Sequence, residues 1–261
     1  MKQPAQVANI TEAVLLVGGA GTRLKDTVQD RPKALAVVAG RAFLEWLLMM
    51  LRNQGIRRVI LATGHMGELI ESHVGDGSRF GLELACVRDP FPMGTGGSLR
   101  NALNRFQSQS LLVLNGDSFC RFIVHELSAF HSQHDSKATI LLTYVNDASR
   151  FGIVETDSTD RVTAFREKSA ARSVGWINAG VYLFDREVVD KIPQGRAVSL
   201  EREVFPGLMR NGLYAMKQGG VFWDIGTSES YAQAEQVLSE EFSRLQQIHG
   251  MSGSSTTART R

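Results

Sequence analysis

The sequence predicts an α/β fold of the Rossmann-like type, in which helices flank a mostly parallel central sheet. Short apolar runs alternate along the chain with helical segments, and such runs are typical of parallel strands that are buried on both faces. Two glycine-rich loops directly follow two of these strands, at residues 18–24 and 89–98. In an open parallel sheet, ligands bind outside the carboxyl ends of the strands, so both loops are expected to face one crevice.

The first apolar run, Ala13 to Val17, ends in the loop around which the chain is organised. This loop and the segment after it supply three glycines, one hydroxyl and two cations: Gly18, Gly19, Gly21, Thr22, Arg23 and Lys33. Glycine lets a ligand approach the main chain closely, and consecutive N–H groups in such a turn converge on an anion. The loop therefore predicts a cradle for a polyphosphate, with positive charge to hold a leaving group.

Two better-known glycine loops do not match this segment. A Walker A loop requires Gly, four residues and then Gly-Lys-Ser/Thr, and no such stretch occurs in the chain. In the dinucleotide-binding loop G-x-G-x-x-G, the third glycine would stand where this chain has Leu24. The segment thus indicates a nucleotide, but neither a P-loop ATPase nor NAD. A strand-to-loop turn with incidental glycines is the structural alternative.

Strand–helix–strand units follow the first loop. The segment Ala42 to Asn53 is predicted to be a helix that is apolar almost all round, so it is either buried or shared with a partner subunit in a homo-oligomer. Strands are predicted at 58–63 and 82–87, with a helix at 67–74 between them, which makes a right-handed parallel unit. The second glycine-rich loop then opens a helix that is expected to begin near Ser98.

One carboxylate is predicted at a strand end and a second on a short strand. The strand 111–114 ends in Asn115-Gly116-Asp117, and the short strand 219–227 carries Asp224. Mg²⁺ takes one or two carboxylates together with phosphate oxygens, so a carboxylate at Asp117, beside the crevice, predicts a magnesium site. Turn chemistry at Asp117 is the structural alternative.

The rest of the chain is predicted to complete a single domain, residues 1–248. Its expected elements are a helix at 123–134, a strand at 138–145, a hairpin of 151–155 and 161–165, a strand at 176–184, and helices at 200–209 and 228–248. Residues 249–261 are rich in Ser, Thr and Gly, which predicts a disordered tail.

Composition argues against several classes of function. The net charge of +2 is too small for a strong field toward nucleic acid, so no nucleic-acid partner is expected. No apolar segment reaches the length that spans a membrane, so no membrane partner is expected either. The N-terminus lacks the apolar core of a signal peptide, which makes the cytoplasm the expected location.

Taken in order, the motifs resemble those of the sugar-1-phosphate nucleotidyltransferases. The resemblance rests on Gly18 to Leu24 with Pro32-Lys33, Gly116-Asp117, Glu167-Lys168, Asn178-Ala179-Gly180 and Asp224-Ile225-Gly226. It covers residues 12–240 and is strongest to the short branch without a C-terminal β-helix. That branch includes the D-glycero-D-manno-heptose 1-phosphate guanylyltransferases and the N-acetylmuramate 1-phosphate uridylyltransferases. The chain resembles the heptose enzymes more, and this likeness rests on Phe151 to Glu155 and Ser199-Leu200-Glu201.

The resemblance implies a reaction in which an NTP and a sugar 1-phosphate give an NDP-sugar and pyrophosphate. The implied catalytic residues are Arg23, Lys33, Asp117 and Asp224, and the implied cofactor is Mg²⁺, shared by the two metal ligands Asp117 and Asp224. The implied nucleotide contacts are Gly18, Gly19, Gly21, Thr22, Arg23, Asp89, Gly94 and Thr95. The implied sugar-phosphate contacts are Asn115, Gly152, Glu167, Lys168 and Asn178.

The base and the acceptor stay open at this point. A carboxylate at Asp89 can accept two in-plane N–H donors, and guanine offers two where uracil and thymine offer one, which favours GTP. The motifs favour D-glycero-D-manno-heptose 1-phosphate as the acceptor. The alternatives are a uridylyl- or thymidylyltransferase acting on another hexose or on N-acetylmuramate 1-phosphate, and a regulatory subunit that binds a nucleotide sugar without catalysis.

Overall fold

The computed structural model of the chain describes residues 7–19, 28, 30–166 and 173–253. Its strands are β1 (Glu12–Leu16), β2 (Val37–Val38), β3 (Arg41–Ala42), β4 (Arg58–Thr63), β5 (Glu83–Arg88), β6 (Ser110–Asn115), β7 (Ser118–Cys120), β8 (Ala138–Val145), β9 (Ile153–Thr156), β10 (Val162–Arg166), β11 (Gly175–Asp185), β12 (Leu213–Lys217) and β13 (Phe222–Asp224). Its α-helices are α1 (Phe43–Asn53), α2 (Gly67–Val74), α3 (Gly94–Ala102), α4 (Val124–Gln133), α5 (Arg186–Asp190), α6 (Phe205–Leu208) and α7 (Ser228–Gly253). Shorter helical turns are η1 (Lys33–Leu35), η2 (Ser78–Phe80), η3 (Leu103–Arg105) and the π-helical turn η4 (Leu200–Val204).

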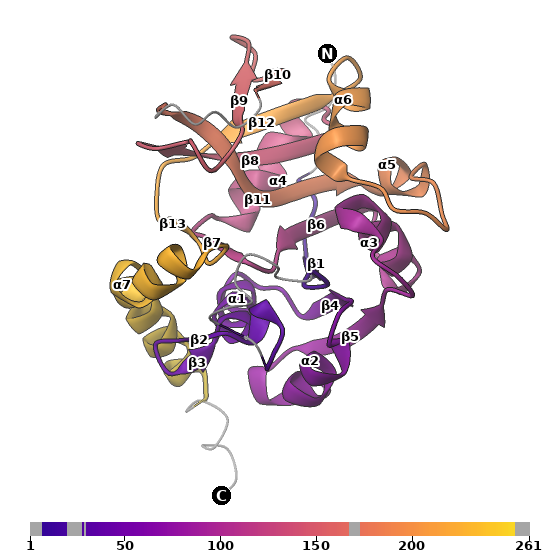
Figure 1. Cartoon of the computed structure of the whole chain (residues 1–261). Coiled ribbons are helices and arrows are strands. Elements are labelled where there is room, and N and C mark those ends of the chain that lie inside the picture. The colour runs from indigo at the N-terminus through magenta and orange to yellow at the C-terminus, as the bar shows by residue number, and fades with distance from the viewer. Residues whose placement is uncertain (1–6, 20–27, 29, 167–172, 254–261) are drawn as a thin grey trace, which may run out of the picture.

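The large sheet has the strand order β10-β9-β11-β6-β1-β4-β5, and β8 and β12 continue from β11 (Figure 1). Strand β1 pairs in parallel with β4 and β6, and β4 pairs in parallel with β5. Strand β11 runs antiparallel to β6, β8 and β9. The predicted α/β fold with a parallel central sheet is therefore confirmed. Antiparallel pairs of β11 with β6, β8 and β9 extend this sheet, and β12 adds to it in parallel with β8.

The sheet separates two hydrophobic cores, because alternate residues of a strand face opposite sides. On β1, Ala13 and Leu15 belong to one core and Val14 to the other. Helices α1, α2, α4 and α7 cover the first core, and α3, α5 and α6 cover the second. Both faces of the central strands are thus dry, which is why these strands are apolar throughout.

Helix α1 is buried within the chain itself. Every residue from Phe43 to Leu51 is buried, and α7 packs across the helix, with the ring of Phe242 stacked on Trp46 at a centroid distance of 4.0 Å. Burying an aromatic side chain of this size is worth about 2–3 kcal/mol. Packing inside one chain accounts for the apolar surface of α1, so a homo-oligomer stays a prediction without support from this helix.

The glycine-rich stretch 94–97 forms the first turn of α3, so the helix begins at Gly94 and the predicted start near Ser98 is wrong. The first N–H groups of a helix have no partner inside it. Here the N–H groups of Gly96 and Gly97 donate to Val198 O at 2.9 and 3.2 Å, so a partner outside the helix stabilises a glycine-rich first turn.

The C-terminal third also differs from its prediction. The segment 200–209 forms η4 and α6, and β12 was not predicted at all. Helix α7 runs past residue 248, so 249–253 of the predicted tail are helical, while 254–261 lie outside the described residues. Helix α7 is the last element of the described residues, and no β-helix occurs among them.

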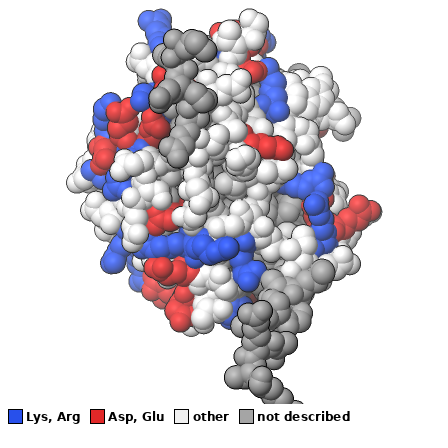
Figure 2. Space-filling view, turned by 180° about the vertical axis from the view of Figure 1, so that it is seen from behind, with Lys and Arg blue, Asp and Glu red and all other residues white. Residues whose placement is uncertain are grey.

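Charges of both signs are interspersed on the molecular surface. On the face opposite to the view in Figure 1, Lys and Arg side chains lie next to Asp and Glu side chains (Figure 2). This mixture is what a net charge of +2 produces in a chain with 29 basic and 27 acidic residues. Among the described residues, no helix is both long and apolar enough to cross a membrane.

Candidate active site

A cavity of about 670 Å³ opens at the carboxyl ends of four neighbouring parallel strands. Its walls include residues that follow each strand: Gly18 after β1, Gly64 after β4, Asp89 after β5 and Asp117 after β6. Small-molecule sites have volumes of roughly 300–1,000 Å³, and open α/β sheets place them at this end of the strands. The cavity therefore has the size and the place of a ligand site.

The first glycine loop packs closely against the end of β4. Gly18 and Gly19 both line the cavity, and a Cβ on Gly18 would lie only 3.1 Å from the backbone nitrogen of Gly64. Because neither residue has a side chain, the main chain at this point is open to a ligand. Three further predicted nucleotide contacts lie outside the described residues: Gly21, Thr22 and Arg23.

The start of α3 forms another wall of the cavity. Gly94 has a φ of +68°, and a Cβ there would lie 2.6 Å from the carbonyl oxygen of Val198. The hydroxyl of Thr95 donates to Glu201 Oε2 and accepts the N–H of Leu200, both at 2.9 Å. Gly94 and Thr95, which are predicted nucleotide contacts, thus lie on the cavity wall. The Thr95 hydroxyl is already hydrogen-bonded to η4 and connects this turn to α3.

Asp89 lies on the cavity wall with its carboxylate held by α3. Ser98 Oγ donates to Asp89 Oδ2, and Asn101 Nδ2 donates to Asp89 Oδ1 at 3.0 Å. Burial raises the pKa of Asp89 above its ordinary value, and the hydrogen bonds from Ser98 and Asn101 oppose this rise only in part. Each carboxylate oxygen has two lone pairs, so both oxygens keep the capacity to accept an N–H from a ligand.

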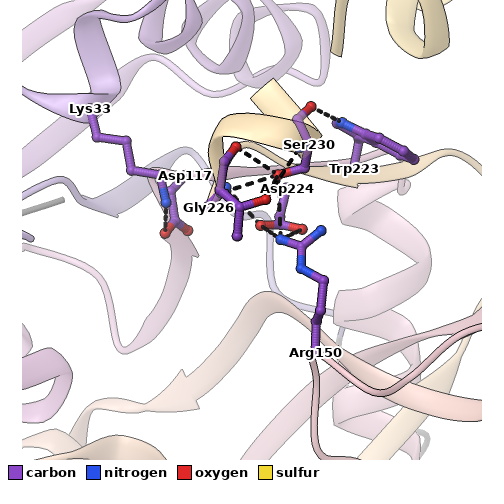
Figure 3. Close-up of polar contacts among 8 residues, drawn as sticks. Lys33, Asp117, Arg150, Trp223, Asp224, Gly226 and Ser230 are labelled. Atoms are coloured by element: carbon purple, nitrogen blue, oxygen red, sulfur yellow. Dashed lines mark hydrogen bonds and ion pairs between the residues drawn. The ribbon is translucent and has the colours of Figure 1, made fainter. Parts of the chain in front are cut away.

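Two ion pairs meet at Gly226 (Figure 3). Lys33 Nζ donates to Asp117 Oδ2 at 2.7 Å, while Arg150 Nη2 donates to Asp224 Oδ1 at 2.9 Å and Oδ2 at 2.8 Å. The N–H of Gly226 donates to Asp224 Oδ2 at 2.7 Å. A Cβ on Gly226 would collide with Asp224 Oδ2 and lie 3.5 Å from Lys33 Nζ. The missing side chain of Gly226 therefore leaves room for the Asp224 carboxylate.

Strand pairing brings the two acids together although they are far apart in the sequence. Strand β13 pairs antiparallel with β7, which places Asp224 opposite Ser118. The N–H of Ile225 donates to the carbonyl oxygen of Asp117 at 2.9 Å. The main chains of Asp117 and Asp224 are therefore tied to each other at one end of this strand pair.

The donor set at this place fits a small hard cation. Two carboxylates are the usual protein share of a magnesium site, and phosphate oxygens and waters take the other positions. The Asp117 side chain is 46% exposed and that of Asp224 is 15% exposed, and each is neutralised by one cation, Lys33 or Arg150. The described residues contain no cluster of three or more metal-ligating side chains. Both carboxylates are therefore paired with cations, so a magnesium ion would have to displace Lys33 and Arg150, and the shared metal site stays a prediction.

The predicted sugar-phosphate contacts are dispersed. Asn115 lines the cavity, and its Oδ1 is buried without a hydrogen-bond partner in the described part of the chain. Asn178 lies behind it: its Oδ1 accepts the N–H of Gly180 at 2.8 Å and its Nδ2 donates to the hydroxyl of Tyr182 at 2.9 Å. A Cβ on Gly180 would lie 2.8 Å from Asn115 Nδ2, so Asn178 shapes the wall behind Asn115.

The remaining sugar-phosphate contacts lie away from the cavity or are not described. Gly152 is absent from the cavity walls and lies beside the backbone of Arg166, at the β9–β10 hairpin. Two further contacts lie outside the described residues: Glu167 and Lys168. The cavity walls thus include all the predicted nucleotide contacts that the structure describes, but only one predicted sugar-phosphate contact, Asn115.

Sequence reasoning missed the side chains that hold Asp89 and Asp224. Ser98 and Asn101 hold Asp89, and the position of Ser98 one helical turn after Gly94 is a signal that could have identified it. Arg150 holds Asp224, and no signal was present, because 74 residues separate the partners.

Glycine loops, cations and carboxylates at the carboxyl ends of parallel strands define a nucleotide-binding α/β protein. The chain belongs to the nucleotidyl transferase family, whose sequence model matches residues 12–241. This match confirms the resemblance on which the site residues were assigned.

Curated relatives and solved structures agree with this family. The chain is 40% identical over 230 residues to a mannose-1-phosphate guanylyltransferase of Mycobacterium tuberculosis, covering 87% of this chain and 64% of the relative. It is 35% identical to the mannose-1-phosphate guanylyltransferase catalytic subunit beta of Drosophila melanogaster, covering 86% of this chain and 62% of the relative. The chain thus spans less than two thirds of the length of these relatives.

The structure of HddC from Yersinia pseudotuberculosis is similar with a TM-score of 0.77 and 28% identity, covering 87% of this chain and 99% of HddC. A second HddC structure, complexed with GMP-PN, is similar with a TM-score of 0.76. These similarities confirm the predicted fold.

Proposed function

We propose that this chain transfers a guanylyl group from GTP to a sugar 1-phosphate and releases pyrophosphate. The observation that carries the proposal is the cavity on which the first glycine loop, Lys33, Asp89 and Asp117 converge. Support for guanine comes from the relatives named mannose-1-phosphate guanylyltransferase and from the HddC structure with GMP-PN.

In this reaction a sugar-phosphate oxygen bonds to the α-phosphorus of GTP, and the bond from that phosphorus to the bridging oxygen of the β-phosphate breaks. The attacking oxygen is already anionic, so it requires no general base. The task of the site is to place two anions in line and to neutralise their charge. Lys33 provides a largely buried cation on the cavity wall for this purpose.

Other residues divide the remaining charge and hydrogen bonds. Magnesium held by Asp117 and Asp224 would screen the repulsion between the two anionic reactants. Arg23 would hold the departing pyrophosphate through its planar guanidinium. Lys168 would bind the phosphate of the acceptor, and Glu167 would accept hydrogen bonds from its hydroxyls.

Asp89 is the proposed reader of the base. Its carboxylate stands on the cavity wall and is kept in one orientation by Ser98 and Asn101. An ionised carboxylate can accept both N–H donors on the Watson–Crick edge of guanine, whereas uracil and thymine offer only one. This side chain would therefore favour GTP over UTP and dTTP.

The proposed acceptor is a sugar 1-phosphate with the manno configuration. D-glycero-D-manno-heptose 1-phosphate is the acceptor that the motifs favour, and mannose 1-phosphate is the one in the names of the curated relatives. Both compounds share the manno ring and differ in the substituent at C6. The contacts that the sugar site makes to this substituent would therefore decide between them.

A substrate panel tests the proposal. Pyrophosphate release is measured with each of the four common NTPs against heptose 1-phosphate, mannose 1-phosphate, glucose 1-phosphate and N-acetylmuramate 1-phosphate. The expected result is turnover with GTP and a manno-configured acceptor. Turnover with UTP or dTTP alone would refute the guanylyl assignment. No turnover, together with tight binding of a nucleotide sugar, would identify a non-catalytic subunit.

A further inference from the structure

The guanidinium of Arg150 covers both oxygens of the Asp224 carboxylate (Figure 3). A single nitrogen, Nη2, donates to the two oxygens and lies 3.3 Å from Ser230 Oγ. Arg150 reaches the acid from the loop between β8 and β9, 74 residues away in the sequence. It therefore occupies the atoms of Asp224 that a metal ligand would have to offer.

The contact is an incomplete one for an arginine. A guanidinium pairs best with a carboxylate when two of its nitrogens donate to the two oxygens in parallel. Here one nitrogen serves both oxygens, and Arg150 Nε is buried without a hydrogen-bond partner among the residues that the structure describes. Arg150 thus has donors to spare, and a phosphate would satisfy them.

Departure of Arg150 requires only a side-chain movement. The backbone of its loop is anchored, because the N–H of buried Ala148 donates to Ser173 O at 2.7 Å and the N–H of Phe151 donates to Ala148 O at 2.9 Å. The guanidinium carbon already lies 5.4 Å from the centre of the Phe151 ring, whose face can support a cation. The arginine can therefore leave Asp224 while the loop stays in place.

We propose that Arg150 is an internal counter-ion that holds Asp224 in the free protein and releases it when the carboxylate becomes a metal ligand. The inference rests on the proposed metal role of Asp224. Lys33 stands in the same relation to Asp117, so each proposed metal ligand has its own cation. Because Arg150 must leave first, the free protein binds a divalent metal more weakly than the bare carboxylates would.

The size of this effect follows from the fraction of molecules in which Arg150 has left. The apparent dissociation constant for the metal equals the intrinsic value divided by that fraction. At the lower limit for a hydrogen bond to a charged group, about one molecule in ten is expected to be open. Removing Arg150 is therefore expected to tighten metal binding about tenfold.

The chain offers a matched control for this experiment. Arg121 Nη1 donates to Glu241 Oε1 at 2.8 Å, with side-chain exposures of 46% and 12%. The corresponding values for Arg150 and Asp224 are 38% and 15%, so the two ion pairs are alike in length and exposure. Arg121→Gln removes such a pair without touching Asp224.

The test measures Mn²⁺ binding to the full chain without nucleotide, by electron paramagnetic resonance of the free ion. The variants are Arg150→Gln, Arg121→Gln, Asp224→Asn and the double variant Arg150→Gln/Asp224→Asn. Arg150→Gln is expected to lower the dissociation constant about tenfold, and Arg121→Gln to leave it unchanged. In the Asp224→Asn background, Arg150→Gln is expected to have no effect, because the carboxylate that it uncovers is gone.

Three results would overturn the inference. These are unchanged or weaker Mn²⁺ binding in Arg150→Gln, equal tightening in Arg121→Gln, and no measurable binding in any variant. If Arg150→Gln does not fold, as judged by circular dichroism, Arg150→Lys replaces it. Lysine keeps the charge but lacks the planar guanidinium, so it is expected to tighten binding by less. The substrate panel reports separately on the proposed function, because GTP turnover by the unmodified chain does not depend on these outcomes.

Discussion

Replacing Asp89 by Asn tests how the chain selects its base. The structure holds the Asp89 carboxylate on the cavity wall through Ser98 and Asn101, and both oxygens keep a free lone pair. A hydrogen bond to a charged group contributes about 1.5–3 kcal/mol. Asparagine keeps one oxygen that can accept an N–H but replaces the other by a donor, so at least one such bond is lost and Asp89→Asn is expected to reduce kcat/KM for GTP at least about tenfold.

Inosine triphosphate makes the assay specific, because its base lacks the 2-amino group and offers only one N–H to Asp89. The unmodified chain is expected to prefer GTP to ITP about tenfold in kcat/KM, the value of one such bond. In Asp89→Asn this preference should fall to within about twofold. Asn101→Ala is the control, since it removes a support but keeps the charge. An equal loss for GTP and ITP, or no loss, would show that Asp89 only begins the turn before α3.

Acidic pH tests the same carboxylate. Burial raises the pKa of Asp89, so Asp89 takes up a proton at a higher pH than an ordinary aspartate. The protonated form can no longer accept two N–H groups. The preference for GTP over ITP is therefore expected to disappear as the pH falls through this raised pKa, and to persist above it.

Three further substitutions have defined outcomes. Asp117→Ala is expected to lower magnesium-dependent turnover about a thousandfold and to leave the fold intact, as judged by circular dichroism. Gly94→Ala places a Cβ against backbone at a φ of +68°, and should destabilise the fold by about 1–3 kcal/mol in urea titrations. Burial opposes ionisation of Glu12, but hydrogen bonds from Ser108 and Arg58 outweigh it and lower the Glu12 pKa. The stabilisation of the fold by ionised Glu12 is therefore fully present above about pH 4.5 and is lost as the pH falls through the lowered pKa. Glu12→Gln should cost about 2–3 kcal/mol at pH 7 and flatten this acid limb.

Sequence patterns predicted the parallel half of the sheet closely. The strand 58–63 and the helix 67–74 match β4 and α2 to the residue. Strands buried on both faces are apolar throughout, and Gly55 and Gly75 mark the ends of the helices beside them. Local composition therefore carries most of the information in this half.

The other half depends on contacts that composition does not encode. Strand β12, with the sequence Leu-Tyr-Ala-Met-Lys, was missed because its partners lie far away in the sequence: it pairs with β8, and its Tyr214 bridges to Arg161. The helical first turn of α3 was missed because its N–H groups are satisfied by Val198, a residue about 100 positions away. Neither signal is local, so neither could be read from a window of the sequence.

The same reasoning separates the side chains of the candidate site. Asp117 was predicted because it follows the end of a strand, which is a local pattern, whereas the role of Asp224 was implied by the family resemblance. Arg150 was not predicted, because only the folded chain brings it to Asp224. The hydrogen bond from Thr95 to Glu201 was not predicted either, because 106 residues separate the two in the sequence.

Under the proposed function, the paired charges of the site would couple the binding of nucleotide to the binding of metal. Lys33 and Arg150 each neutralise one carboxylate, so these four side chains carry no net charge together. A triphosphate can draw Lys33 and Arg150 to its oxygens only when Asp117 and Asp224 have gained another counter-charge, because otherwise two carboxylates would face the phosphates. Binding of the nucleotide and filling of the two carboxylates must then favour each other, and by linkage the coupling is equal in both directions. In the proposed reaction, the site would become positive toward phosphate only after Lys33 and Arg150 have both left their carboxylate partners, so the charge needed for transfer would appear when the substrate binds.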